Sequence, residues 1–312
     1  MSTHSDSTPD DNASSDYTSS DNAAGTNIVK APAAGKRVIV TGAAGGIGAA
    51  LATELITRGA RVVLADLSPT VTETAAALDA SADASADASA HAWVGDVSSV
   101  AGIDDLIGFA DDRLGGVDMY FANAGIIGPA GLGDTDGDWD AIIDVNMRAH
   151  IRAAQALVPR WQEAGSGYFV ATASAAGLLT QIGSAAYSVT KHASVGFAEW
   201  LSLTYRDDGI RASVIAPMGV DTDLLRASGA DGPAQAAVTE AGTVLSPAAV
   251  ATVVLDAVES EQFLILPHPE VLDMYRMKGS DYDRWLKGMS RYQRRLNEQT
   301  RLNEESTHAG NH

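Results

Sequence analysis

The sequence of 312 residues contains no cysteine, which excludes disulfide bonds, thiolate metal ligands and a cysteine nucleophile. Long apolar runs are also missing: no segment approaches the roughly 20 consecutive apolar residues that a membrane helix needs. The N-terminus lacks the basic start and apolar run of a secretory signal. We therefore expect a soluble cytoplasmic protein without a metal site.

Basic residues are scarce: 21 Lys and Arg stand against 40 Asp and Glu, giving a formal net charge of −19. Such an acidic surface disfavours binding to nucleic acid and to anionic membranes, and solubility is the simplest reason for it. Apolar residues make up 46% of the chain, enough to bury one large core. We expect a small-molecule substrate, with neither a nucleic acid nor a membrane as partner.

Large apolar side chains are almost absent from residues 1–35, which cannot offset the entropy of ordering and are predicted to form a disordered tail. Residues 36–268 alternate short apolar runs with helical patterns. Strands are expected at 37–41, 62–65, 92–95, 118–122, 167–173, 211–216 and 263–266. Helices are expected from the end of the glycine cluster 42–48 through residue 58, and at 70–78, 100–113, 139–164, 185–207 and 247–258. This alternation predicts an α/β domain with a doubly wound parallel sheet, the Rossmann fold.

Two segments fall outside the alternation. Residues 80–90 repeat Ala-Asp-Ala-Ser and are predicted to form a surface insertion. Residues 269–312 are predicted to form a helical extension with a disordered end. Apolar and aromatic side chains recur there at helical spacing, and they are Tyr275, Tyr282, Trp285, Met289, Tyr292 and Leu296. This spacing predicts one amphipathic helix whose apolar face covers the domain, the substrate cleft or a partner subunit.

A glycine-rich turn, Thr41–Gly48, lies between the first strand and the first helix. Glycines let the backbone approach a pyrophosphate closely, and the helix N-terminus supplies amides and a favourable dipole. Asp66 follows at the end of the next strand, where a carboxylate can bind the ribose hydroxyls of NAD. It would repel the 2′-phosphate of NADP, and neither Gly45 nor Leu67 is basic. The turn therefore predicts NAD as the cofactor, in preference to NADP.

Tyr187 and Lys191 are four residues apart on one helix face. A neighbouring cation favours the phenolate, so the tyrosine can exchange a proton with a carbinol or carbonyl oxygen while hydride moves to or from the cofactor. Alone, such a pair is usually an accident of a surface helix. Ser174 ends the preceding strand and can polarise the substrate oxygen, although a cap or turn is the simpler role. Asn146 lies in a helix interior, which its propensity disfavours; it is either functional or a buried amide satisfied by backbone.

These residues resemble the short-chain dehydrogenase/reductase family over about residues 36–268. Seven segments in the family's order carry the resemblance: Thr41–Gly48, Gly95–Val97, Asn123–Gly125, Asn146, Ser174, Tyr187 with Lys191, and Pro217–Thr222. The resemblance implies a homo-oligomer, a dimer or a tetramer. The cofactor-binding residues expected from the turn and the resemblance are Gly42, Gly45, Gly46, Ile47, Gly48, Asp66, Leu67, Asp96, Val97, Asn123, Ala124, Gly125, Tyr187, Lys191, Pro217, Val220 and Thr222.

The resemblance also implies individual roles. Asp96 and Val97 would contact the adenine, and Asn123 would hold the central sheet and the cofactor ribose. Asn146 would hold a water that links Lys191 to solvent. Val220 and Thr222 would bind the nicotinamide carboxamide. Met218 stands where the family often has glycine, so it is a candidate for shaping the pocket.

The substrate of such a fold occupies the crevice beyond the carboxyl ends of the strands. The candidates for its lining are mostly apolar or small, and they are Ile126, Ile127, Ala175, Ala176, Gln181, Met218, Gly219 and the loop 223–244. They predict an NAD-dependent alcohol dehydrogenase or ketoreductase for a neutral, largely apolar secondary alcohol. The loop 223–244 would be a lid. Its Arg226 is the one cation that could reach an anionic substrate, although an exposed cation at a helix end is the simpler role. The alternatives are a catalytically silent NAD-sensing protein and an interaction protein that uses its C-terminal helix.

Overall fold

In the part of the chain that the structure describes, seven parallel strands form a central sheet in the order β3-β2-β1-β4-β5-β6-β7. The computed structural model describes residues 33–81, 88–227, 237, 240 and 242–310. The strands are β1 (Arg37–Thr41), β2 (Arg61–Asp66), β3 (Ser89–Val94), β4 (Met119–Ala122), β5 (Gly167–Thr172), β6 (Ile210–Ile215) and β7 (Leu264–Ile265). The strand order reverses between β1 and β4, which confirms the predicted doubly wound sheet.

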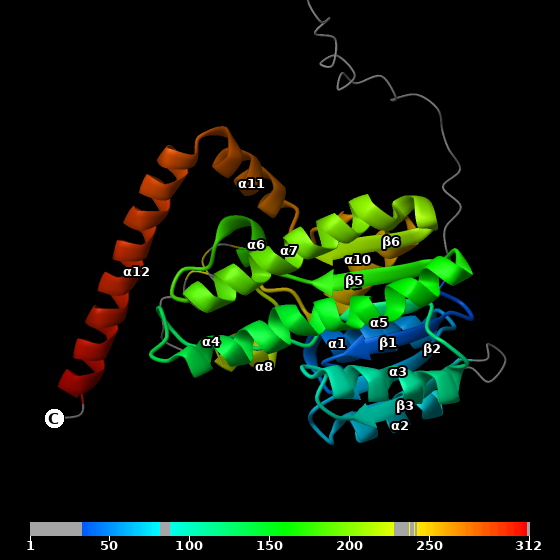
Figure 1. The fold of residues 1–312 in the computed structure, drawn as a ribbon. Coiled ribbons are helices and arrows are strands. Elements are labelled where there is room, and N and C mark those ends of the chain that lie inside the picture. The colour runs from blue at the N-terminus through cyan, green and yellow to red at the C-terminus, as the bar shows by residue number, and fades with distance from the viewer. Residues whose placement is uncertain (1–32, 82–87, 228–236, 238–239, 241, 311–312) are drawn as a thin grey trace, which may run out of the picture. The chain divides into compact units, whose positions relative to one another are not determined.

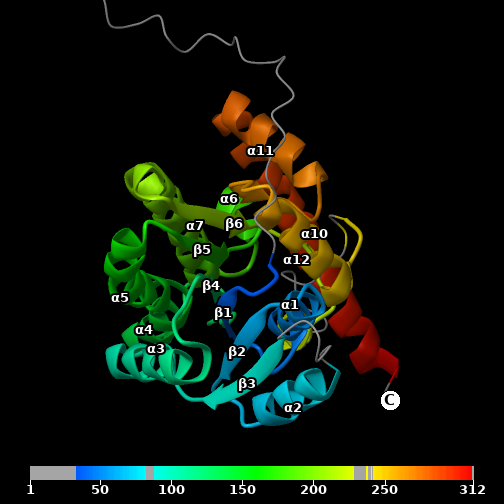
Figure 2. The same ribbon diagram turned by 90° about the vertical axis from the view of Figure 1, so that its right-hand side faces the viewer.

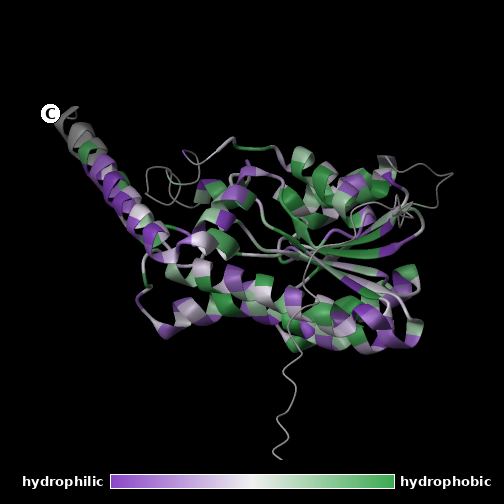
Figure 3. Ribbon diagram, turned by 90° about the horizontal axis from the view of Figure 1, so that it is seen from above, coloured by the Kyte–Doolittle hydropathy of each residue, from purple (hydrophilic) through white to green (hydrophobic). Residues whose placement is uncertain are grey.

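Helices cover both faces of this sheet (Figure 2). One layer contains α1 (Gly46–Thr57), α2 (Val71–Ser81) and α10 (Pro247–Glu259), and the other contains α3 (Val100–Leu114), α5 (Ala149–Ala164) and α7 (Ala185–Tyr205). Successive side chains of β1 pack alternately against the two helix layers: Val38 and Val40 lie in one core and Ile39 lies in the other. Side chains alternate along a strand, so burial on both faces requires the continuous apolar runs seen in the sequence (Figure 3).

Serine side chains fix the starts of two helices around the site. Ser184 Oγ accepts a hydrogen bond from the Tyr187 amide at 3.3 Å, so the first turn of α7 is held by its own cap. Ser246 Oγ accepts one from the Ala249 amide at 3.2 Å, and Pro247 occupies the first turn of α10. The helix predicted to begin at Ser246-Pro247 is thereby confirmed.

The helix expected over residues 139–164 is interrupted. It begins earlier, as α4 (Asp136–Ile143), because Thr135 and Asp138 form a capping box. A π-helical turn, η1 (Asp144–Arg148), then separates α4 from α5. The prediction of one regular helix is wrong at this turn, which contains Asn146; π-turns of this kind are frequent at functional sites.

The predicted insertion at residues 80–90 is too wide. Strand β3 begins at Ser89 and pairs with β2 through residues that include Ser89 and Ala90, while α2 continues to Ser81. Residues 82–87 lie outside the described residues. The tail predicted over residues 1–35 also lies outside them, apart from its last three residues, of which Ala33 is buried in the core beside α1.

The C-terminal segment forms two helices where one was predicted. These are α11 (Glu270–Ser280) and α12 (Tyr282–Gly310), joined at Asp281, whose backbone is extended at φ −154° and ψ 88° (Figure 1). The break destroys the single apolar face: Leu296 is buried and Trp285, Met289 and Tyr292 are partly buried, but Tyr275 and Tyr282 are exposed. Residues 311 and 312, at the end predicted to be disordered, lie outside the described residues.

Three short elements were not predicted, and they are α6 (Ala176–Leu179), η2 (Arg206–Asp208) and α8 (Asp223–Ala227). Helix α8 opens the segment predicted to be a lid, and residues 228–236, 238, 239 and 241 of that segment lie outside the described residues. Within the described part of the chain, no helix is both long enough and apolar enough to cross a membrane.

Candidate active site

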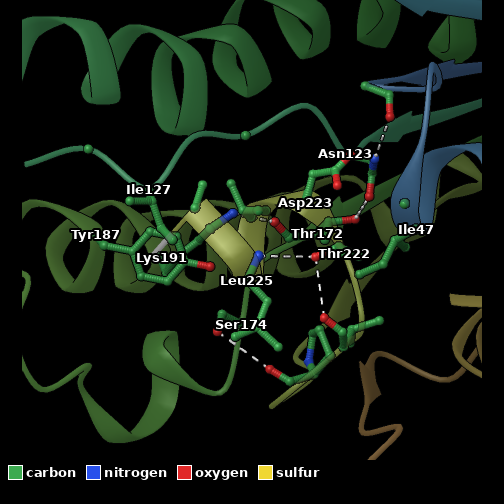
Figure 4. A pocket seen from close by; sticks show the side chains of 18 of the residues that line it. Ile47, Asn123, Ile127, Thr172, Ser174, Tyr187, Lys191, Thr222, Asp223 and Leu225 are labelled. Atoms are coloured by element: carbon green, nitrogen blue, oxygen red, sulfur yellow. Dashed lines mark hydrogen bonds between the residues drawn. The ribbon is translucent and has the colours of Figure 1, made fainter. Parts of the chain in front are cut away.

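A cavity of about 520 Å³ lies where the sheet's strand order reverses (Figure 4). Its walls come from the loops after β1, β4, β5 and β6. The predicted site residues that line it are Gly42, Gly45, Gly46, Ile47, Asp66, Asn123, Ala124, Gly125, Ile127, Ser174, Gln181, Tyr187, Lys191, Pro217, Met218, Val220 and Thr222. Residues far apart in the sequence are thus brought to one space.

The glycine turn is shaped by close backbone contacts. Gly42 has φ +65°, and a Cβ atom there would lie 2.8 Å from the Ala124 Cα. A Cβ on Gly48 would lie 2.1 Å from the Gly42 carbonyl oxygen, so Gly48 acts in packing and lies outside the cavity lining. A Cβ on Gly45 would meet no atom within 4 Å. The turn therefore leaves open space beside Gly45, at the N-terminus of α1, where a pyrophosphate would fit.

Asp66 stands at the end of β2 with its carboxylate held by two amides. Oδ2 accepts a hydrogen bond from the Ala44 amide at 2.9 Å, and Oδ1 accepts one from the Ser68 amide at 2.8 Å. These contacts fix the carboxylate beside the glycine turn. Among the described residues that line the cavity, Lys191 is the only Lys or Arg. The Asp66 end of the cavity therefore has no described cation for a 2′-phosphate.

Asn123 ties together the ends of three strands. Its Nδ2 donates to the Thr41 carbonyl oxygen at 3.0 Å, and its Oδ1 accepts from the Thr172 hydroxyl at 3.1 Å. Its own amide donates to the Thr41 hydroxyl at 2.9 Å. This side chain therefore braces β1, β4 and β5, and the Thr172 hydroxyl belongs to the brace.

Tyr187, Lys191 and Ser174 face the same space (Figure 4). Lys191 is buried, its Nζ donates to the Thr172 carbonyl oxygen at 3.0 Å, and Nζ lies 5.5 Å from the centre of the Tyr187 ring. Burial lowers the pKa of Lys191 to about 8. Burial also raises the pKa of Tyr187, and a hydrogen bond with Ser174 opposes that rise. Desolvation therefore outweighs the lowering by Ser174, and the lowering of the Tyr187 pKa expected from Lys191 is not found.

Asn146 is fully buried in the π-turn, and its side chain is satisfied mainly by backbone. Oδ1 accepts from the Ile126 amide at 2.8 Å, and Nδ2 donates to the Ile126 carbonyl oxygen at 2.9 Å. Its own carbonyl oxygen accepts from the Ser194 hydroxyl at 2.9 Å. Asn146 Oδ1 and Lys191 Nζ both border Gly125, where an added Cβ would lie 3.3 Å and 3.5 Å from them. Asn146 thus adjoins Lys191 behind the cavity wall.

Several predicted residues lie outside the cavity lining. Ala176 is buried in α6, and its amide donates to the Ser174 hydroxyl at 3.1 Å, so it orients Ser174 and does not form the pocket surface. Gly219 accepts from the Leu245 amide through its carbonyl. Leu67 is exposed, and Asp96 and Val97 follow β3 away from the lining. The adenine contacts of Asp96 and Val97 stay predictions.

Two apolar lining residues were missed: Pro129 and Ala130 come from the loop after β4, for which the sequence predicted no lining beyond its first residues. Leu224 and Leu225 of α8 also line the cavity, and they lie in the loop 223–244 that was expected to cover the substrate. Arg226 forms ion pairs with Asp221 and Asp223 and lies outside the lining. It is therefore an exposed, paired cation and not a substrate anchor in this structure.

Comparison with known proteins agrees with this geometry. A family model described as short chain dehydrogenase matches residues 36–232. The 1-deoxy-11-beta-hydroxypentalenate dehydrogenases of Streptomyces avermitilis and Streptomyces exfoliatus are 35% and 32% identical, over 74% of this chain and 84% and 82% of theirs. A short-chain dehydrogenase/reductase from Burkholderia phymatum, solved in complex with NAD, superposes with a TM-score of 0.71 at 27% identity, covering 81% of this chain and 95% of that one. Levodione reductase superposes with a TM-score of 0.66 at 25% identity, covering 74% and 95%.

Proposed function

The chain belongs to the short-chain dehydrogenase family of nicotinamide-dependent oxidoreductases, and from this we propose that it interconverts a neutral, largely apolar secondary alcohol and its ketone with NAD. One observation carries the proposal. Tyr187, Ser174 and Lys191 line one cavity together with the Asp66 carboxylate, and the remaining wall of that cavity is mostly apolar.

The choice of NAD is supported by Asp66. Its two amide contacts hold the carboxylate where the hydroxyls of an adenosine ribose would be bound. A 2′-phosphate there would face a fixed negative charge, and the described lining offers no cation at that end. The open space beside Gly45 fits the pyrophosphate, and the similar Burkholderia phymatum protein was solved with NAD. Val220 and Thr222, beside the turn, would hold the carboxamide.

The proton chemistry belongs to Tyr187. In the oxidative direction its phenolate takes the proton of the alcohol, and in reduction its phenol protonates the carbonyl oxygen. The single proton of the Ser174 hydroxyl, donated to the Pro217 carbonyl in this structure, would turn to the same oxygen and polarise it. The cofactor, when bound, supplies or accepts the hydride, and its oxidised ring carries a positive charge that favours the phenolate. Lys191 holds its place through Thr172 and adds a second cation near the phenol.

Asn146 adjoins Lys191 and is proposed to serve the proton path behind it. Its side chain is occupied by Ile126, so the contribution open to it is its main-chain carbonyl oxygen in the π-turn. That oxygen already accepts from Ser194, and a carbonyl has a second lone pair for a water between it and Lys191.

The apolar character of the substrate is supported by the wall facing Tyr187. Ile127, Met218 and Leu225 contribute apolar surface there, while Gln181 adds an uncharged polar group. A carboxylate or phosphate on the substrate would find Lys191 as the only described cation in the lining, and that side chain is committed to the reacting end. The relatives named above are called hydroxypentalenate dehydrogenases, a name that denotes a hydroxylated carboxylate; it agrees with an alcohol substrate and gives no support to its neutral charge.

A homo-oligomer, a dimer or a tetramer, is proposed as well. Val189, Trp200 and Leu203 are exposed and lie on one stripe of α7, outside the contacts of that helix with the sheet. Burial of this stripe against a second copy would remove it from water. Light scattering of the purified protein tests this: a monomeric mass would contradict it.

The decisive experiment is a screen for NADH formation with cyclic, aromatic and terpenoid secondary alcohols, run in parallel with NADP. We expect turnover with NAD on at least one neutral alcohol. Tyr187→Phe should lower kcat about 10²- to 10⁴-fold, since it removes the general acid/base, and should leave NAD affinity nearly unchanged. Undiminished turnover by Tyr187→Phe, or tight NAD binding with no turnover on any class of alcohol, would contradict the proposed function; the latter result would favour a silent NAD sensor.

A further inference from the structure

His268 is a buried histidine just beyond β7, and the main chain engages both of its ring nitrogens. Nδ1 lies 3.1 Å from the Met218 amide nitrogen, and Nε2 lies 2.9 Å from the Thr243 carbonyl oxygen. A backbone N–H can only donate and a backbone carbonyl can only accept. Nδ1 must therefore accept and Nε2 must carry the proton, so the two contacts fix the neutral ring in one tautomer.

The amide that His268 binds belongs to the peptide group between Pro217 and Met218. The carbonyl oxygen of the same peptide accepts from the Ala175 amide at 2.8 Å and from the Ser174 hydroxyl at 3.4 Å. A peptide group is planar, so fixing its N–H also fixes the direction of its carbonyl. His268 and Ser174 therefore form hydrogen bonds to opposite edges of the same peptide group.

The far side of the ring holds a second piece of backbone against the same loop. Thr243 lies two residues before Leu245, whose amide donates to the Gly219 carbonyl at 3.0 Å and whose carbonyl accepts from the Asp221 amide at 2.9 Å. The Met218 methyl group packs beside Gly242, where an added Cβ would lie 2.6 Å from it. His268 thus links the two backbone segments that place Met218 in the cavity wall.

We propose that His268 is a positioning residue for the active site: it holds the Pro217–Met218 peptide so that Ser174 and Met218 keep their orientation toward the substrate. The inference rests on the proposed function, because only there do Ser174 and Met218 face a substrate. Without the ring, the Met218 N–H has lost its acceptor, and a buried unpaired amide costs enough free energy to reorient the peptide. Reorientation moves the carbonyl that orients the Ser174 hydroxyl.

Kinetics of matched variants tests this role. His268→Phe keeps an aromatic ring but removes both nitrogens, and we expect kcat to fall about 10- to 100-fold because the reacting groups are misplaced. His268→Gln keeps one acceptor and one donor, and kcat should recover to within about threefold of the original enzyme, since the amide can serve both partners. His91→Phe, on the edge strand β3, is the control and should leave kcat unchanged. All variants are compared well below their melting temperatures.

Nuclear magnetic resonance provides a readout that does not need turnover. The ¹⁵N shifts of His268 should show an unprotonated Nδ1 and a protonated Nε2, and His268→Phe should shift the amide resonances of Met218 and Ala175. A protonated Nδ1, unshifted amides, or full kcat in a folded His268→Phe variant would each overturn the proposal. If the original enzyme turns over no alcohol, the proposed function fails while the tautomer and the amide shifts still decide the positioning of the peptide.

Discussion

The Nζ atom of Lys191 donates a hydrogen bond of 3.0 Å to the Thr172 carbonyl oxygen at the end of β5. The contact anchors a buried ammonium group beneath Tyr187, in a place where no described carboxylate pairs with it in an ion pair. Desolvation is the reason its pKa falls to about 8, from 10.5 in an exposed lysine. The site therefore keeps a cation next to its acid/base at the expense of folding stability.

Replacing this lysine should separate stability from activity. Below pH 8 both the folded and the unfolded protein carry the charged lysine, and the folded state bears the full cost of burying it. Between pH 8 and 10.5 the folded state loses the proton first, so the stability of the original protein rises with pH, by up to about 3 kcal/mol. Lys191→Met lacks this titration. It should be the more stable protein at pH 7 and lose that advantage by pH 10.5.

Urea unfolding of both proteins at pH 7, 8.5 and 10.5 measures the gap. A gap in the free energy of unfolding that stays constant with pH would contradict the buried-cation explanation. Turnover by Lys191→Met should fall most at pH 7, where the lysine is charged, because the phenolate of Tyr187 loses a neighbouring positive charge.

Asp66 predicts the cofactor preference. Asp66→Asn keeps the shape of the side chain and an acceptor for one of the Ala44 and Ser68 amides, places an NH2 group opposite the other, and removes the charge. We expect the ratio of kcat/KM for NAD to that for NADP to fall about 10-fold, since roughly 1.4 kcal/mol of repulsion at this separation is reasonable in a partly exposed site. Adding Leu67→Arg should lower it further by offering the 2′-phosphate a cation. Steady-state kinetics with both cofactors decide the matter, and an unchanged ratio would remove Asp66 from the ribose site.

His150 is a buried histidine that the proposed chemistry does not use. It lies on α5 one turn beyond Asn146, edge-on to Phe169 at 6.2 Å between ring centres, and both of its ring nitrogens lack a described partner. Burial, and secondarily the Lys191 charge, lower its pKa to about 3. The unfolded chain takes up a proton near pH 6.5 while the folded protein does not, so stability is lost progressively as the pH falls from 6.5 toward 3.

His150→Leu should therefore be more stable than the original protein by about 1–3 kcal/mol at pH 7, because leucine has a similar volume to histidine and lacks its two unpaired polar atoms. The difference in unfolding free energy between this variant and the original protein should be larger at pH 4.5. His192→Leu, on the exposed side of α7, is the matched control and should change neither value. Thermal unfolding at the two pH values checks this; a destabilised His150→Leu would indicate that the ring has polar partners after all.

The parts of the site that the sequence predicts are those that depend on short spacings. The glycine turn, Asp66 at the next strand end and the Tyr187–Lys191 pair each follow from residues within one strand–helix unit. The parallel sheet is predicted from short, continuous apolar runs such as those of β1 and β5, which lack the spacing of an amphipathic helix. Contacts join these units to one another, as at the Asn123 brace and the Ser174 turn. They can be predicted once the doubly wound topology of the sheet is known.

Other features depend on contacts that no local pattern encodes. The π-turn at Asn146 is stabilised by Ile126, twenty residues earlier, and the sequence there reads as an ordinary helix. No proline marks the break at Asp281, so the spacing of the aromatic residues predicted one continuous helix across it. His268 and Lys278 are polar residues that become buried because distant backbone groups, at Met218 and Leu178, complete their hydrogen bonds. Burial of such groups is decided by tertiary structure alone.

The packing of α12 gives the last prediction. Leu296 is 1% exposed and packs with Ile182 and Ala237, in a small apolar cluster that also receives Met289 and Tyr292. Near it, Arg295 forms a 2.7 Å ion pair with Glu240. Ile182 adjoins Gln181 in the cavity wall, so this cluster is where the C-terminal helix meets the substrate side of the domain.

Leu296→Ala should release that contact. Removing a buried leucine side chain costs about 2–5 kcal/mol where the site cannot collapse, which exceeds what an exposed ion pair such as Arg295–Glu240 returns. We therefore expect α12 to open locally, with faster amide hydrogen exchange across residues 285–300 and an unchanged rate in β4 and β5. Leu286→Ala, on the same helix but 54% exposed, is the matched control and should exchange like the original protein. Equal protection of α12 in the two variants would mean that the helix is held by contacts other than the Leu296 cluster.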